Sequence, residues 1–315
     1  MLRNYLLLTL MIVLWSFSFI VVDISVEIIP PISVAFYRFF ITSLSFLIID
    51  IYLKLIKKST RNNNSIPDTN AKFTKNDWIL IEMAAFTGVI IFFYVQYNAI
   101  SLIGPSLPAL FVCLLSPVVI TILALLFFDE KVNIVKIVGF IVATVGGFLL
   151  VTGGDIRNLT PESPNFLGYF FAVLTSVLWA VYSTITKKIT ETNSSMKMVK
   201  FLCYVSTPQL FILVLINGEL IILIENLFNI VIVLAELYLG IACTLIGYYI
   251  WQNSQKEMKS SKVASFLYVE PFLTLLFSFL LQRSEIIVLW NIFGGIIVLI
   301  AVLIINYEKK TEDIV

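Results

Sequence analysis

The sequence predicts an all-α polytopic membrane protein with ten transmembrane helices, arranged as two inverted five-helix repeats. Hydrophobic residues make up 59% of the 315 positions and charged residues only 13%, while the mean hydropathy is +0.98. Soluble globular proteins contain about 45–50% apolar and about 25% charged residues, so both values depart toward membrane proteins. Ten apolar windows are long enough to cross a hydrocarbon core about 30 Å thick, which gives the number of spans.

Polar or turn-forming residues separate these windows and set their limits. The first span has no small-residue cleavage site, so we expect it to be retained rather than removed as a signal peptide. The ten predicted spans are 5–23, 33–54, 78–100, 107–127, 134–152, 166–187, 198–217, 230–251, 263–281 and 288–306.

The distribution of Lys and Arg predicts the orientation. With the N-terminus inside, eighteen of the 21 basic residues fall in cytoplasmic loops or tails, two (Arg157 and Arg283) fall outside, and Arg38 lies within the second span. Basic residues concentrate on the cytoplasmic side of membrane proteins. We therefore expect a multi-pass protein of the cell membrane with both termini in the cytoplasm, and a flexible cytoplasmic loop from Lys57 to Asp77.

Repeated features predict the inverted arrangement. Pro117 and Pro271 lie 154 positions apart at the same place in the fourth and ninth spans, and Tyr94 and Tyr248 have the same offset. Because each copy holds five spans, the second copy enters the membrane from the opposite side, a recurrent transporter design. The predicted parts are a first repeat (1–152), an exterior linker (153–165), a second repeat (166–307) and a cytoplasmic tail (308–315).

The residue types exclude several kinds of chemistry. The chain has no histidine, and its three cysteines, Cys113, Cys203 and Cys243, lie in apolar runs without ligand spacing. Phosphate-binding glycine loops and zinc-ligand patterns are missing too. We expect no cofactor, no metal site, no nucleic-acid partner and no enzymatic activity, and any proton transfer must use carboxylates.

Glu270 is the most informative candidate, because it is a carboxylate near the centre of a span and directly precedes Pro271. An ionisable residue in lipid is costly, and such residues usually face the bundle interior or a water-filled cavity. A functional Glu270 contacts a substrate amine or carries a proton. The alternative is a protonated or hydrogen-bonded carboxyl that holds helices together.

Other charged residues have weaker signals. Arg38 in the second span can bind a solute carboxylate or phosphate through its planar guanidinium, or pair with Glu270; a structural ion pair is the alternative. Glu236 lies within two turns of the exterior edge, and Asp50 and Glu82 lie near cytoplasmic ends. We expect those three to be solvated end residues.

Aromatic and hydroxyl side chains supply further candidates for a solute-binding wall. Trp15 with Ser18, and Trp179 with Tyr182, lie away from the interfaces, whereas Tyr94 and Tyr248 lie near the exits of their spans. Interfacial aromatic belts explain the second pair equally well. Small residues every four positions, Gly139–Ala143–Gly147 and Ala172–Ser176–Ala180–Thr184, predict close helix packing.

Short motifs occur along the chain in the order Leu14-Trp15-Ser16, Pro31, Ala35, Arg38-Phe39, Ser116-Pro117, Asp129-Glu130, Gly139, Gly146-Gly147, Trp179-Ala180-Val181-Tyr182 and Tyr268-Val269-Glu270-Pro271. In this order, the motifs resemble the drug/metabolite transporter superfamily, specifically a chain with two EamA-type domains. The resemblance covers nearly the whole chain. The second copy departs from the family pattern, which often has Gly-Glu after the ninth span where this sequence has Gln282-Arg283-Ser284-Glu285.

The resemblance implies alternating access and export of small organic metabolites such as amino acids, with a proton as one candidate coupling ion. The superfamily also includes importers and exchangers, so uptake or exchange of a phosphorylated or nucleotide-linked metabolite is the alternative within transport. A membrane-embedded enzyme or scaffold is the alternative from another class. Similar scaffolds carry different cargoes, so fold alone does not identify the solute or the oligomeric state.

The predicted orientation is tested by labelling. A single cysteine at Asn64, in a variant without native cysteines, should resist a membrane-impermeant maleimide in intact cells and react after permeabilisation. A cysteine at Glu162 in the exterior linker is the matched control and should react in intact cells. Labelling of the Asn64 cysteine in intact cells would overturn the assignment.

Overall fold

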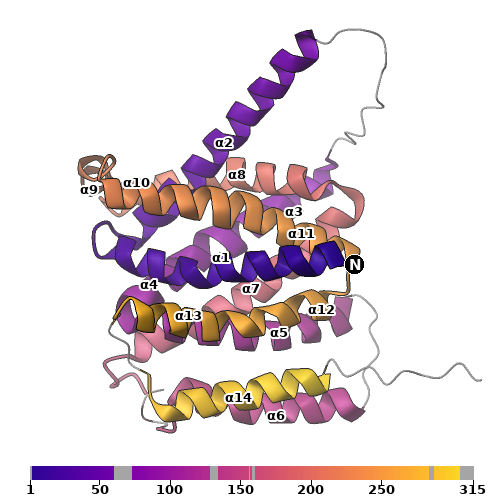
Figure 1. Ribbon diagram of the computed structural model, residues 1–315, viewed down its shortest axis with the longest axis vertical. Helices are drawn as coiled ribbons and strands as arrows, with labels where there is room; N and C mark the ends of the chain where they lie inside the picture. Colours follow the sequence, from indigo (N-terminus) through magenta and orange to yellow (C-terminus); the bar gives the residue numbers. More distant parts are fainter. Residues whose placement is uncertain are drawn as a thin grey trace, which may run out of the picture.

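The structure is a computed structural model that describes residues 2–59, 73–127, 134–155, 157, 160–283 and 287–305. All regular secondary structure in these ranges is helical (Figure 1). Eight helical segments are long and apolar enough to cross a membrane, and two shorter apolar helices, Ile141–Leu150 and Leu289–Ala301, occupy the positions of predicted spans five and ten. The predicted fold class, an all-α polytopic membrane protein, is confirmed.

The first half contains five consecutive helical rods. The third rod changes helix type along its length, which the hydropathy pattern did not predict. The elements are α1 (Leu2–Val26), α2 (Pro31–Ser59), α3 (Lys75–Ala85) continued by the π-helix η1 (Phe86–Ile91) and α4 (Phe92–Ile103), α5 (Ser106–Phe127) and α6 (Ile134–Thr152).

The second half follows the same plan with more interruptions. The elements are α7 (Phe166–Thr192), α8 (Ser195–Ile216), the short α9 (Leu220–Glu225), α10 (Ile230–Leu237) continued by the π-helix η3 (Tyr238–Gly247) and α11 (Tyr248–Glu257), α12 (Ser260–Ala264) continued by the 3₁₀ helix η4 (Ser265–Val269) and α13 (Glu270–Leu280), and α14 (Leu289–Ile305).

Local chemistry explains several boundaries. Thr74 and Asp77 form a capping box that starts α3, with the Thr74 hydroxyl accepting from the Asp77 backbone N–H. Helix α4 stops at Gly104, whose φ of 78° is a left-handed conformation that suits glycine, and Pro105 follows.

The internal contacts obey a two-fold pattern. Helices α6 and α14 pack on each other as a separate pair (Figure 1), and α2 packs on α8. The contact of α4 with α7 matches that of η3 with α1, and the contact of α5 with α7 matches that of α13 with α1. Moreover, η1 shifted by the 154-residue offset falls inside η3. These equivalences support the two-repeat arrangement.

The two repeat prolines have different local effects. Pro117 lies inside the continuous helix α5, whereas Pro271 lies in the first turn of α13, directly after η4. Pro271 therefore lies where the ninth span changes helix type, within one helical segment from Lys262 to Leu280.

Gly146 and Gly294 bring one helix of each half close together, and neither belongs to the predicted Gly139–Ala143–Gly147 stripe. A Cβ on Gly294 would lie 2.3 Å from the Leu150 backbone nitrogen and 2.7 Å from the Gly146 carbonyl oxygen. Ala143 and Gly147 instead line a groove between α5, α6 and α7. Small residues thus bring α6 and α14 into backbone contact, as is common in membranes.

This contact gives a stability prediction. Gly294→Ala should lower the unfolding temperature of the purified protein, because the new methyl group meets backbone that cannot move away; overpacking typically costs about 1–3 kcal/mol. Gly295→Ala is the matched control, since its Cβ would meet only the Leu114 and Leu110 side-chain ends at 3.1 and 3.5 Å. Equal thermal unfolding curves for the two variants in detergent would contradict this account.

Candidate functional site

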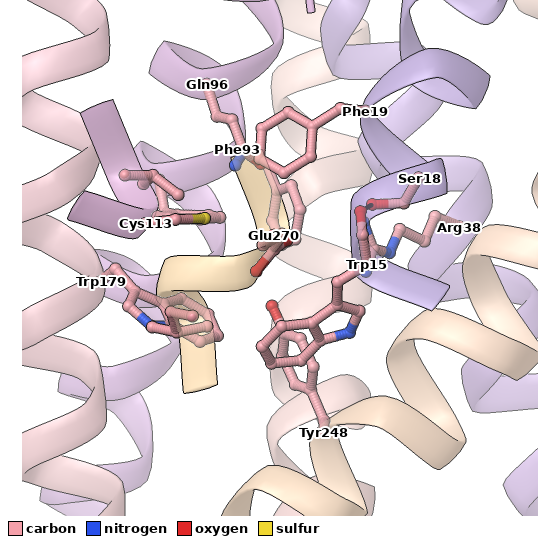
Figure 2. A pocket seen from close by; sticks show the side chains of 13 residues that line it. Trp15, Ser18, Phe19, Arg38, Phe93, Gln96, Cys113, Trp179, Tyr248 and Glu270 are labelled. Carbon is pink, nitrogen blue, oxygen red and sulfur yellow. Dashed lines mark hydrogen bonds between the residues drawn. The ribbon is translucent and has the colours of Figure 1, made fainter. Parts of the chain in front are cut away.

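A cavity lies in the interior of the helix bundle, where both halves meet. Six of the eight predicted site residues line it: Glu270, Arg38, Trp15, Ser18, Trp179 and Tyr248. Figure 2 shows the Glu270 carboxyl group between Cys113, Trp179 and Trp15, with Arg38 beside Ser18. The remaining lining residues are Phe19, Phe92, Phe93, Gln96, Val112, Cys113 and Leu267.

Glu270 is the acidic residue of the cavity. It is the first residue of α13 and only 2% exposed. Its carboxyl group is hydrogen-bonded with the Cys113 thiol from α5, and its Oε2 atom has no partner among the described residues. A buried polar atom without a partner is costly, so this oxygen suits a ligand or a bound proton. Cys113, whose position in an apolar run without ligand spacing indicated no binding role, lines the cavity.

Arg38 is the basic residue of the cavity, and polar side chains from both halves fix its guanidinium. Its Nε donates to the Thr244 hydroxyl, and its Nη1 donates to the Tyr97 hydroxyl at 2.8 Å. The guanidinium carbon also lies 4.8 Å from the centre of the Phe93 ring, a cation–π distance. The described contacts include no direct ion pair with Glu270, so each charge remains available to a solute.

The π-helix η3 supplies the hydroxyl group that accepts a hydrogen bond from Arg38. The same Thr244 hydroxyl donates to the Leu239 carbonyl, which lies five residues earlier in this π-helix. Thr42, one turn after Arg38, donates to the Gly240 carbonyl at 2.8 Å. Two hydroxyl contacts therefore join α2 to η3 around the buried arginine.

Two tryptophans, one from the first helix of each half, meet at the cavity. The rings of Trp15 and Trp179 are 5.3 Å apart in an edge-to-face geometry, and Tyr248 lies 5.9 Å from Trp15 and 6.0 Å from Trp179. Trp15 donates from Nε1 to the Cys243 carbonyl, and Gly247 makes room for it, since a Cβ there would lie 2.4 Å from that nitrogen. The aromatic wall is thus rigidly held.

Tyr182 lies behind this wall. Its ring is 5.2 Å from Trp179, and its hydroxyl accepts from the Gln252 Nε2 at 3.1 Å. Gln252 also donates to the Thr186 hydroxyl. Tyr182 therefore supports Trp179 rather than lining the cavity, and Gln252 is a supporting residue that the motifs did not indicate.

The placement of Tyr94 does not match the prediction that it forms part of the solute wall. Its side chain is 42% exposed and its ring packs on Phe171. Its neighbours Phe92 and Phe93 line the cavity instead. Tyr97, one turn further along, is buried and holds Arg38.

Glu236 also corrects an expectation. It was expected to be a solvated end residue, but it is fully buried and its two carboxyl oxygens have no partner among the described residues. Asp50 is only partly buried and Glu82 is exposed, and Lys200 donates to Asp50 at 3.0 Å while Gln209 donates to Glu82. Glu236 differs from the other two because neighbouring helices bury it. The distance of a residue from the end of a span does not reveal such burial.

Polar contacts tie the halves together on both sides of the cavity. Arg283, after α13, pairs with Asp23 of α1 and with Glu27. At the other end of α1, Asn4 donates to Glu257 of α11 at 2.6 Å. The cavity between them is about 50 Å³, room for little more than a few waters, and its lining residues are buried, so little solvent reaches Glu270 in this conformation.

Some predicted features lie outside the described residues. They are Asp129, Glu130, Ser284, Glu285, the tail from 308 to 315 and most of the Lys57–Asp77 loop.

Comparison with known proteins places this site in a family of transporters. Two relatives described as uncharacterized transporters come from Archaeoglobus fulgidus (26% identity over 288 residues, 88% of each chain) and Clostridium kluyveri (26% over 246 residues, 77% of each). The uncharacterized transporter YyaM of Bacillus subtilis is 22% identical, over 87% of this chain and 83% of its own.

A solved crystal structure has the same fold. It covers 96% of both chains with a TM-score of 0.63 at 16% sequence identity. The EamA-like transporter family model matches residues 2–152 and 166–307. With two such regions spanning nearly its whole length, this chain belongs to the EamA-like transporter family and is a multi-pass membrane transporter.

Proposed function

We propose that this transporter works by alternating access and exports small zwitterionic metabolites, such as amino acids, from the cytoplasm across the cell membrane. Both termini face the cytoplasm in this proposal. The observation that carries it is the presence of one carboxylate, Glu270, and one guanidinium, Arg38, in a single aromatic-walled cavity.

Each group complements one part of such a solute. The Glu270 oxygen that lacks a partner binds the solute ammonium group, and Arg38 presents its planar donors to the solute carboxylate. Trp15, Trp179 and Tyr248 provide faces for an apolar side chain or for the ammonium group itself. A zwitterion thus meets opposite charges in a dry environment without bringing net charge into the core.

A phosphorylated or nucleotide-linked solute fits less well. A phosphate group carries up to about two negative charges, whereas Arg38 is the one basic side chain among the cavity-lining residues that the structure describes. Glu270 would repel such an anion at short range. The zwitterion therefore has the stronger support.

Transport requires the closed cavity to open on each side in turn. The contacts that join α1 to the second half, Asn4 with Glu257 at one end and Asp23 with Arg283 at the other, are candidates for the closures on the two sides. Inverted repeats commonly rock against each other around a fixed site near the midplane. Protons are the proposed coupling ion, with carboxylates as their carriers.

The role of Glu270 is tested by substitution. In proteoliposomes loaded with a panel of radiolabelled amino acids, Glu270→Gln should lower efflux at least about tenfold, because losing one partner of a buried charge contact costs about 2–5 kcal/mol. Glu225→Gln, which changes an exposed carboxylate on α9, should give the same efflux rate as the unsubstituted protein. Comparable efflux by Glu270→Gln at equal reconstitution across a range of pH would leave Glu270 as a structural residue.

A further inference from the structure

The interior of the bundle holds an unequal set of charges. In the part of the chain that the structure describes, three charged side chains are buried: Arg38, Glu236 and Glu270. They are one cation and two acids. Arg38 and Glu270 line the cavity, but Glu236 does not.

Glu236 has no evident structural partner. It lies in the last turn of α10, directly before η3, and is 0% exposed. Neither carboxyl oxygen has a hydrogen-bond partner among the described residues. A carboxyl group kept only for helix packing is normally satisfied by hydrogen bonds, so this residue calls for another explanation.

The groups that interact with Glu236 are one positive charge and two tyrosine hydroxyls. Arg38 is the charge that acts on it, and Tyr37 of α2 and Tyr97 of α4 also interact with it electrostatically. From η3, Tyr238 and Cys243 both donate to the Leu14 carbonyl. On α1, Asp23 is engaged by Arg283.

Charge balance in the closed state requires one further positive charge. With both glutamates ionised, Arg38 leaves the core with a net charge of about −1, which a low-dielectric interior disfavours strongly. A zwitterionic solute adds no net charge, so it does not remove this deficit. If Arg38 and Glu270 bind the two ends of the solute, the uncompensated group is Glu236.

We propose that Glu236 is a second proton-binding site, separate from the solute cavity, which carries the proton that accompanies transport. This inference rests on the proposed function and names the coupling group. The proton comes from water on one side and returns to water on the other; only the carboxyl O–H bond forms and breaks. Arg38 links the two sites, since it lines the cavity and also acts on Glu236.

A spectroscopic test needs no solute. Infrared difference spectra of the protein in lipid, recorded between acidic and alkaline pH, should contain a carbonyl band of a buried protonated carboxyl group. Glu236→Gln should remove this band, whereas the surface control Glu225→Gln should leave it unchanged. Glu236→Asp keeps a carboxyl group and should shift the band. This variant tests the assignment of the band to residue 236 if the Gln variant does not fold. A band unaffected by either Glu236 substitution would overturn the proposal.

A transport test separates this proposal from the role of Glu270. In Glu236→Gln the buried charged side chains among the described residues are Arg38 and Glu270, which balance each other without a proton. Efflux of the labelled amino acids should therefore persist, with the ratio of rates at acidic and alkaline pH falling to about one because the proposed proton carrier is gone. Glu270→Gln should lose efflux yet keep the Glu236 infrared band. An unaltered pH profile in Glu236→Gln would refute the coupling role, even if Glu270 proved essential.

Discussion

The cost of charge in a low-dielectric interior is the constraint on which the arrangement of this transporter depends. Arg38, Glu236 and Glu270 are buried where water cannot solvate them, and the surrounding helices are shaped to tolerate them. The unusual backbone lies next to these residues. The π-helix η3 presents Thr244 to Arg38, and the backbone changes from the 3₁₀ helix η4 to the α-helix α13 at Glu270.

Most of the fold could be predicted from the sequence because lipid leaves few options. Backbone polar groups in the hydrocarbon core must be satisfied internally, so long apolar windows become helices, and their number and approximate limits follow. The same argument identified Glu270 and Arg38, because a charged side chain within a span is energetically costly and usually has a functional role. Trp15 and Trp179 followed from their distance to the interfaces.

The remaining features depend on which face of a helix meets a neighbour. Tyr94 and Phe93 are adjacent in the sequence, yet one faces outward and the other lines the cavity, and the π-helix η1 just before them changes the register of the rod. A pattern based on 3.6 residues per turn does not locate such an insertion. Glu236 was misjudged for a related reason: its place along the span is near the end, but α1, α2 and η3 pack against α10 there.

Symmetry of fold combines here with asymmetry of charge. The first repeat contributes the buried cation, Arg38, and the second contributes both buried acids, while Ser116 stands in the first repeat where the second has Glu270. The attraction therefore acts across the boundary between the halves, and in the proposed alternating-access mechanism this is the boundary that rearranges. A proton or a solute that changes this attraction changes the energy of holding the halves together. Under that proposal, two similar helical bundles convert a binding event into motion without a dedicated moving part.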